Sequence, residues 1–209
     1  MKPNVEKLEI DKLKFESLRT NPRFISILHF ARVLNALMFC LQSYNDYKDS
    51  DSPVANRQKF RSLFIMMGFL HEGFVLLEKL ETQFSGENFF DNTLGRMTND
   101  IKIKNFRDND LVKIRNANSF HFGDKVVPQT LKKLDLNEYI LISFESPSFM
   151  DMYFPLADEL DFNFWTKDTK NHKEETEKIT EILSTSLNIT VKFIKAAEKF
   201  MSDAYQQIA

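Results

Sequence analysis

The sequence predicts a mainly α-helical protein, an up-and-down helical bundle with a small two-stranded β insertion before the last helix. Apolar residues recur every three or four positions over three long segments, which is the spacing of helices with one buried face. Only 5 glycines and 6 prolines occur among 209 residues, which argues against a turn-rich β-sandwich or barrel. The length and the 43% share of hydrophobic residues fit a single domain over residues 1–209.

Three long helices are expected, over Arg23–Tyr44, Arg57–Ser85 and His172–Ile208. The first follows the stop-and-restart signal Asn21-Pro22, and a polar loop over Asn45–Asn56 separates it from the second. The expected buried positions of the first helix are Phe24, Ile27, Leu28, Ala31, Leu34, Met38 and Leu41, broadened by Ile25, Val33, Leu37 and Phe39. Those of the last helix are Ile179, Ile182, Leu183, Leu187, Phe193, Ile194, Ala197, Phe200, Met201 and Ala204.

The second long helix contains two glycines, Gly68 and Gly73, inside its apolar pattern. Each costs roughly 1 kcal/mol relative to alanine in a helix interior. Close approach of another helix is one reason to tolerate them. The expected buried residues of this helix are Phe60, Leu63, Met67, Leu70, Phe74, Leu77 and Phe84.

Shorter elements complete the predicted bundle. Residues 1–20 carry isolated apolar residues among charges and are expected to form an N-terminal arm or a short helix. A short helix over Leu111–Phe120 is expected after a cap at Asp108 or Asn109, and Gly123 can end it.

The region before the last helix changes in period and in charge. Tyr139–Phe144 and Leu160–Trp165 are rich in β-branched and aromatic residues and predict two strands, within an acidic insertion over residues 135–166. Residues 101–133 hold eight basic and three acidic side chains, a net charge of +5, whereas residues 135–177 have a net charge of −8. These are either two solvated surfaces, or an anion-binding patch beside an acidic segment that binds a basic partner or shields the patch.

Several classes of site are disfavoured by composition. The single cysteine, Cys40, excludes an internal disulfide and a cysteine-rich zinc site, and it is expected to be an inert buried thiol. Four histidines leave little room for a metal cage, so neither a metal nor another cofactor is expected. No secretory signal and no uncharged apolar run of membrane-spanning length is visible, so we expect a cytoplasmic protein without a membrane partner.

One stretch in the basic segment carries a chemical pattern. Residues 115–121 read Arg-Asn-Ala-Asn-Ser-Phe-His: an arginine, a polar residue directly after it, and a histidine six positions past the arginine. This resembles the Arg-polar-x-His signature of the HEPN superfamily. The resemblance implies a dimeric helical bundle, and many such proteins are metal-independent endoribonucleases of toxin–antitoxin, antiphage or RNA-processing systems. It also implies that Arg115 and His121 are the catalytic pair with Asn116 as polar companion.

The chemistry fits these side chains. RNA is cleaved when its 2′-hydroxyl attacks the adjacent phosphate and leaves a cyclic phosphate. A histidine near its neutral pKa moves the proton, and a forked guanidinium holds phosphate oxygens. His121 in a last helical turn would gain from the helix dipole, and Asn116 would orient the histidine, the phosphate or the hydroxyl. The expected substrate-binding residues around the pair are Lys113, Asn118, Ser119 and Arg107.

Helix geometry favours a site shared by two copies. Six helical residues span roughly 9 Å and turn the two side chains about 120° apart, so one protomer does not obviously bring both to one phosphate. A homodimer with the site at its two-fold seam solves this. His29, Arg32 and Asn35 form either a polar slot at that seam, with Arg32 and Asn35 behind the site, or a satisfied network.

The same spacing occurs once more and weakens the argument from spacing alone. Arg23 and His29 are also six apart, but Phe24 follows the arginine, which suits packing. Structural readings of the motif remain open: Arg115 pairs with Asp110 or Asp158, and His121 caps a helix.

Three functions therefore compete. The first is a HEPN-type endoribonuclease, a toxin or a defence or stress enzyme restrained by an antitoxin or regulatory protein in trans. The second is a non-catalytic HEPN-like protein that binds nucleotide or RNA, or serves as a dimeric scaffold. The third is an unrelated helical interaction domain that binds a basic protein through its acidic insertion.

Overall fold

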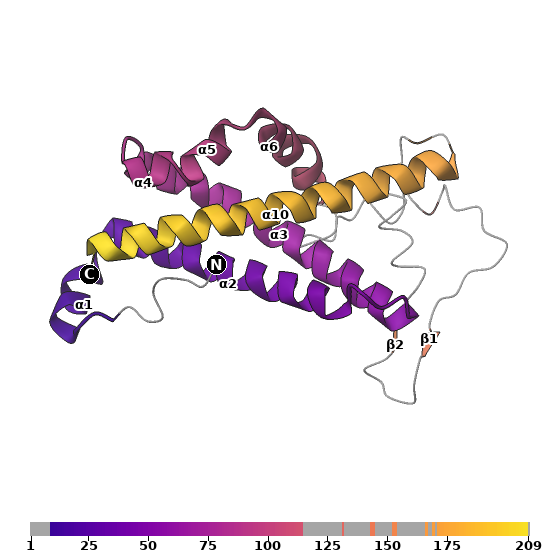
Figure 1. Ribbon diagram of the computed structural model, residues 1–209, viewed down its shortest axis with the longest axis horizontal. Coiled ribbons are helices and arrows are strands. Elements are labelled where there is room, and N and C mark those ends of the chain that lie inside the picture. The colour runs from indigo at the N-terminus through magenta and orange to yellow at the C-terminus, as the bar shows by residue number, and fades with distance from the viewer. Residues whose placement is uncertain are drawn as a thin grey trace.

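The protein is mostly helical, and its long helices pack as a bundle (Figure 1). A computed structural model describes residues 9–114, 131, 143–144, 152–153, 166, 169 and 171–208. Its longer helices are α1 (Lys12–Leu18), α2 (Pro22–Tyr47), α3 (Pro53–Phe84) and α10 (His172–Ile208). Shorter pieces follow α3, namely α4 (Asn88–Asp91), α5 (Leu94–Asn99), α6 (Ile101–Phe106), the π-helix η1 (Arg107–Leu111) and α7 (Val112–Ile114).

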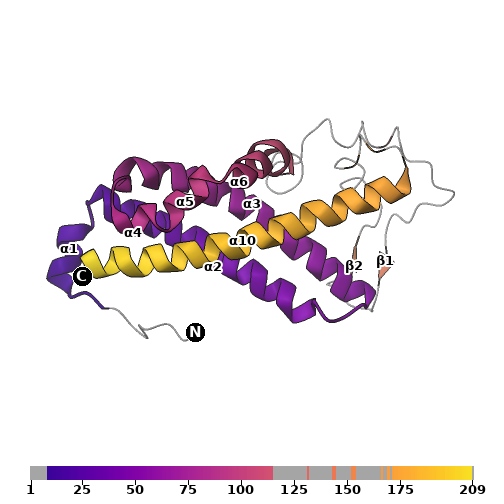
Figure 2. The ribbon, with the colours of Figure 1, turned by 45° about the horizontal axis from the view of Figure 1, so that its top comes forward.

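The long helix α10 lies across the hairpin of α2 and α3, with α4, α5 and α6 along its other side (Figures 1 and 2). The helix starts use local caps. Asn21 Oδ1 accepts from the backbone N–H groups of Arg23 and Phe24, with Pro22 in the first turn of α2. Ser52 Oγ likewise accepts from the N–H of Ala55, which fixes the start of α3.

All three long helices were predicted from the sequence, and the first and last residues of one of them were also predicted correctly. The helix α10 has the predicted bounds, His172–Ile208. The helix α2 starts one residue earlier and runs three residues further than expected, and α3 starts four residues earlier at Pro53. The polar connection is shorter than predicted because Ser52-Pro53 is itself a cap followed by a favourable first helical residue.

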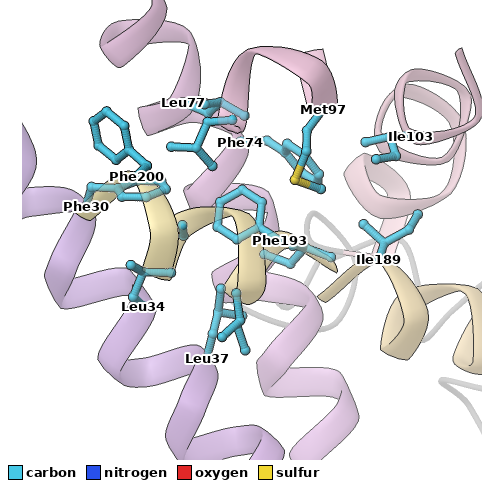
Figure 3. Close-up of a cluster of buried hydrophobic side chains, with 14 of the residues drawn as sticks. Phe30, Leu34, Leu37, Phe74, Leu77, Met97, Ile103, Ile189, Phe193 and Phe200 are labelled. Carbon is cyan, nitrogen blue, oxygen red and sulfur yellow. The ribbon is translucent and has the colours of Figure 1, made fainter. Parts of the chain in front are cut away.

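Phenylalanines from α2, α3 and α10 form the centre of the core (Figure 3). Phe90 of α4 packs against Phe200 beside them. The ring of Phe193 lies 5.6 Å from that of Phe30 and 5.3 Å from that of Phe74, measured between centroids. The ring of Phe200 meets Phe30 and Phe84 edge to face, at 6.2 and 5.5 Å. The last helix therefore joins the hairpin through interlocking aromatic rings.

The buried face of α2 differs from the predicted one. Leu28 and Met38, expected inside, are 39% and 40% exposed, and Phe39 is 74% exposed. Phe30, which was not among the expected buried residues, is fully buried, and Leu37 is fully buried as expected. The cause is that α2 carries apolar residues around most of its circumference, so the three-four spacing does not define a unique face.

At Gly73 the helices α3 and α10 come very close. A Cβ atom at this position would lie 2.9 Å from Phe193 Cζ. This explains the glycine as a close-approach position, as the sequence indicated.

The segment after α3 runs back along it. Thr98 Oγ1 donates to Glu81 Oε1, and nine residues later Arg107 Nη1 donates to Glu78 Oε1, one turn earlier in α3. The predicted start of the short helix at Asp108 or Asn109 is wrong. The helical path begins after Asp100, whose Oδ1 accepts from the N–H groups of Lys102 and Ile103, and continues through η1 to Ile114. The predicted end, at Phe120 and Gly123, lies outside the described residues.

Only short strand segments are described before α10. Ser143–Phe144 (β1) pairs antiparallel with Met152–Tyr153 (β2), Ser143 opposite Tyr153. The strand β1 falls within the predicted strand Tyr139–Phe144. The other predicted strand, Leu160–Trp165, lies outside the described residues, so the insertion over 135–166 stays a prediction.

Two helices of the bundle are long and apolar enough to cross a membrane. An eighteen-residue window of α2 has a mean hydropathy of 1.8, and one of α3 has 1.4. Core helices of globular proteins meet the same criterion, so this is weak evidence for a membrane span.

Candidate functional site

The structure describes the residues that lead into the predicted site from its N-terminal side, and not the catalytic candidates themselves. The catalytic candidates Arg115, Asn116 and His121 lie outside the described residues, and so do Asn118 and Ser119. The chain is described up to Ile114, directly before Arg115.

This flank is anchored in the core. Leu111 and Ile114 are 0% and 2% exposed, and η1 and α7 both contact α3. In the π-turn the N–H of Val112 donates to the carbonyl of Arg107, five residues earlier. Such turns widen a helix locally and occur frequently at functional sites.

Of the predicted substrate-binding residues, Arg107 is engaged within the protein. Its Nη1 lies 3.0 Å from Glu78 Oε1, and its Nε lies 2.7 Å from Asp108 Oδ1. The hydrogen bond with Arg107 lowers the pKa of Asp108, and the same bond raises the pKa of Arg107. Arg107 therefore ties η1 to α3, whereas Lys113 is exposed six residues further along.

Arg32 and Asn35 point away from the core. Both are exposed, and with Ile25, Leu28 and Phe39 they follow one helical stripe opposite the buried residues of α2, here named the outer α2 face. Beside it His29, Arg32, Val33, Phe69 and Leu76 line a groove of about 320 Å³ between α2 and α3. The three polar residues that the sequence grouped therefore share a surface, and do not form a buried network.

The second arginine–histidine pair has structural contacts. Arg23 Nη2 donates to the carbonyl of Gln83 at 2.7 Å, and Arg23 Nη1 lies 2.7 Å from Glu87 Oε1. Its guanidinium carbon stands 4.8 Å from the centre of the Phe84 ring. These contacts agree with the packing reading of the Arg23-Phe24 sequence.

One pocket near the predicted site was missed by sequence reasoning. It has a volume of about 330 Å³ and lies between α6–η1 and α10. The lining residues of the first wall are Lys102, Asn105, Phe106, Asn109 and Asp110, and those of the second are Lys178, Glu181, Ile182 and Thr185. The spacing of the first set, three and four apart, was a signal that could have been found had the helix start been placed at Asp100.

The other potentially reactive side chains are weaker candidates for a functional site. Burial raises the pKa of Cys40 to about 11, which agrees with an inert thiol. His71 Nδ1 lies 3.7 Å from Glu72 Oε1 within α3. No cluster of three or more histidine, cysteine or acidic side chains suited to a metal occurs among the described residues.

Comparisons with protein-family models, with curated proteins and with solved structures found no match to this chain.

Proposed function

We propose that this chain is a metal-independent endoribonuclease of HEPN type that acts as a homodimer. The observation that carries the proposal is the Arg115-Asn116…His121 pattern, which begins at the residue after the helical path α6–η1–α7. That path is anchored by Leu111 and Ile114 in the core of a helical bundle. An anchored flank is what a precisely positioned catalytic arginine requires.

The contrast with the other arginine–histidine pair supports this choice. Arg23 is held by Gln83, Glu87 and Phe84, which accounts for it structurally. The Arg115 pattern instead follows a π-turn and a net-positive stretch of chain, both of which suit a phosphate site.

The proposed reaction is an intramolecular transesterification at a phosphate of the RNA. The 2′-oxygen forms a bond to phosphorus, the bond to the 5′-oxygen breaks, and a cyclic phosphate remains. His121 takes the proton of the 2′-hydroxyl or returns one to the leaving oxygen, while Arg115 and Lys113 offset the charge of the phosphate oxygens. Asn116 orients these groups. This chemistry uses proton transfer and fixed positive charge.

The outer α2 face is the proposed dimer seam. It turns away from α3, against which η1 and α7 pack, so it joins two copies at a distance from the flank of Arg115. Ile25 and Leu28 are 36% and 39% exposed on it, and Phe39 is 74% exposed. Large apolar side chains gathered on one face mark an interaction surface more often than scattered ones do. Arg32 and Asn35 lie between them, where a second copy would meet them.

The biological setting follows from the resemblance alone. A ribonuclease of this kind acts as a toxin or in defence, in the cytoplasm, and is restrained by an antitoxin or regulatory protein in trans. The acidic segment over 135–166 is the proposed contact for a basic partner or the shield of the cationic patch.

The test is cleavage of a labelled structured RNA by the purified protein in excess EDTA. We expect wild type to cut and to leave cyclic phosphate ends, and Arg115→Ala and His121→Ala to cut at least ~100-fold more slowly. The matched controls are Arg23→Ala and His29→Ala, which carry the same residue types at the same spacing and should cut like wild type.

The outcomes separate the alternatives. The assignment of the site is contradicted if the Arg23 and His29 variants lose as much cleavage activity as the Arg115 and His121 variants. It is also contradicted if all four variants cut at the wild-type rate. No cutting by a folded wild-type dimer rejects the ribonuclease.

A second candidate, a non-catalytic dimeric scaffold that binds nucleotide or RNA, is favoured by the exposed Phe39 on the outer α2 face. It predicts retained RNA affinity without cleavage, lowered by Arg115→Ala. Tight binding of a basic protein, indifferent to Arg115 and His121, would instead favour the interaction-domain reading.

A further inference from the structure

The groove between α2 and α3 has the size of a small-molecule site. Its volume of about 320 Å³ lies at the lower end of the usual range for ligand pockets, ~300–1,000 Å³. The described residues that line it are His29, Arg32 and Val33 of α2 with Phe69 and Leu76 of α3. The groove therefore combines three apolar side chains with two that carry nitrogen donors.

The apolar side of the groove is held in place by the core. Val33, Phe69 and Leu76 are half-buried and pack against the core cluster. Gly73 lies between Phe69 and Leu76 in α3, and a Cβ atom at this glycine would be 3.5 Å from Val33 Cγ1, so the two helices approach closely at this point. The apolar side is thus made of packed residues and exists before any ligand enters.

Arg32 and His29 form the polar side of the groove, three residues apart on α2 and on one face of it. Both are exposed, and within the part of the chain that the structure describes neither side chain makes a hydrogen bond or an ion pair. This differs from Arg23, whose guanidinium lies 2.7 Å from Glu87 Oε1. The donors of Arg32 and His29 can therefore contact a ligand in the groove.

No carboxylate occurs among the described residues that line the groove. The acidic residue of α2 is Asp46, about four turns past Arg32 and roughly 21 Å further along the axis. The acidic residues of α3 have partners outside the groove, namely His71 for Glu72, Arg107 for Glu78 and Thr98 for Glu81. The permanent charge of Arg32 therefore makes this groove favour an anion.

An amphipathic anion matches both sides of the groove. A bare anion such as phosphate would leave the apolar side in water, and an uncharged apolar molecule would leave Arg32 without a counter-charge. A single carboxylate on a hydrocarbon chain meets both requirements. The guanidinium fork holds the two carboxylate oxygens with parallel hydrogen bonds, and the methylene groups cover the apolar side chains.

We propose that this groove binds a medium-chain aliphatic carboxylate. The carboxylate lies on the guanidinium of Arg32 and accepts a ring N–H of His29, and the hydrocarbon chain lies along Val33, Phe69 and Leu76. The inference goes beyond the proposed ribonuclease, since it uses none of the catalytic candidates. Because Arg32 also belongs to the outer α2 face, the groove opens beside the proposed dimer seam.

The test is titration calorimetry of the full chain with octanoate, butyrate and octylamine, each below its micelle-forming concentration. We expect octanoate to bind at least about tenfold more tightly than butyrate, which has a shorter chain, and than octylamine, which has the opposite charge. Equal affinity of octanoate and octylamine means that the chain alone is recognised, and equal affinity of octanoate and butyrate means that the charge alone is recognised. Either result, or no binding of octanoate, overturns the proposal.

A matched pair of arginine variants locates the site. Arg32→Gln should weaken octanoate binding at least about tenfold and should not weaken that of octylamine. The control is Arg61→Gln, the same change on an exposed residue of α3 that does not line the groove, and it should bind octanoate like wild type. Equal weakening in both variants means that only the overall charge acts, and the proposed site is then wrong.

A third variant separates the groove from the dimer seam. Phe39 lies on the outer α2 face and does not line the groove. Phe39→Lys should therefore bind octanoate at least as tightly as wild type, even where sedimentation shows a monomer. Loss of octanoate binding together with loss of the dimer would place the site between two copies, and would overturn a groove site within one chain.

Discussion

At Gly73 the packing of α3 against α10 depends on a missing side chain. Gly73→Ala would put a Cβ atom 2.9 Å from Phe193 Cζ, and Phe193 is fully buried between Phe30 and Phe74. Overpacking costs about 1–3 kcal/mol, more than the roughly 1 kcal/mol of helix propensity that alanine gains. We expect a lower free energy of unfolding in urea. In a background of Phe193→Leu the loss should shrink, and an increase in stability of Gly73→Ala itself would contradict the close approach.

The negative charge of the ionised Asp110 carboxylate destabilises the folded protein. Burial raises its folded-state pKa above the usual value of 3.8. The protonated form is favoured in the folded state, so this stabilisation is complete below the unfolded pKa and is lost as the pH rises through the folded pKa. Asp110→Asn should therefore be more stable than wild type at neutral pH, and the difference should close near pH ~4. Thermal unfolding between these pH values measures it, and a pH-independent difference would contradict it.

Single residues were harder to place from the sequence than the helices that carry them. Phe30 and Phe39 both belong to α2, yet Phe30 is fully buried and Phe39 is 74% exposed. The choice depends on where α10 lands, which local periodicity does not contain. The roles of Arg23 and Phe24 were predictable, because a core residue directly after the arginine already indicated packing.

At the scale of elements, the cap of α6 is the clearest correction. Both Asp100 and Asp108 precede helical residues, and the π-turn that carries the helix past Asp108 leaves no sequence signal. Segments with strong periodicity and a clean break, such as α10, were predicted to the residue. The short pieces α4 to α6 were not predicted. The helices α4 and α5 pack against both α3 and α10, and α6 packs against α5 and η1, so their stability comes from tertiary contacts and not from local periodicity.

This correction makes a paired prediction. Asp100→Ala removes the side chain that accepts from the N–H groups of Lys102 and Ile103, and should lower stability by about 1 kcal/mol. Asp108→Ala changes one of the two caps that the sequence suggested, removes an exposed ion pair with Arg107 and should cost less. Urea unfolding of both variants measures the order, and the reverse order would restore a helix start at Asp108.

At the scale of the whole molecule, the outer α2 face predicts self-association. Phe39→Lys places a charge in the middle of an apolar contact and should convert the proposed dimer to a monomer in sedimentation experiments. Leu13→Lys is the control, because Leu13 is 83% exposed on α1 and lies off this face. A wild-type monomer at micromolar concentration, or equal dissociation in both variants, would reject the seam.

The helical bundle could be predicted from composition and periodicity, whereas only part of the candidate site could be predicted from the sequence. The pattern of arginine, asparagine and histidine is local, so the sequence could single it out. The convergence of Lys102 and Asp110 with Glu181 brings residues some seventy positions apart together, and only the folded chain shows it. Contacts between residues so far apart in the chain leave no periodic pattern in the sequence.

The crossing of α10 over the α2–α3 hairpin also has a consequence for synthesis. Phe30 and Phe74 are translated long before Phe193 and Phe200, which cover them. At ~5–20 residues per second, the ribosome needs about 5–20 s to make the stretch between Phe84 and Ile182. For that interval Phe30 and Phe74 lack the rings of Phe193 and Phe200, which pack against them in the folded protein. A chaperone that shields apolar helices on the ribosome would therefore protect the nascent protein until its last helix emerges.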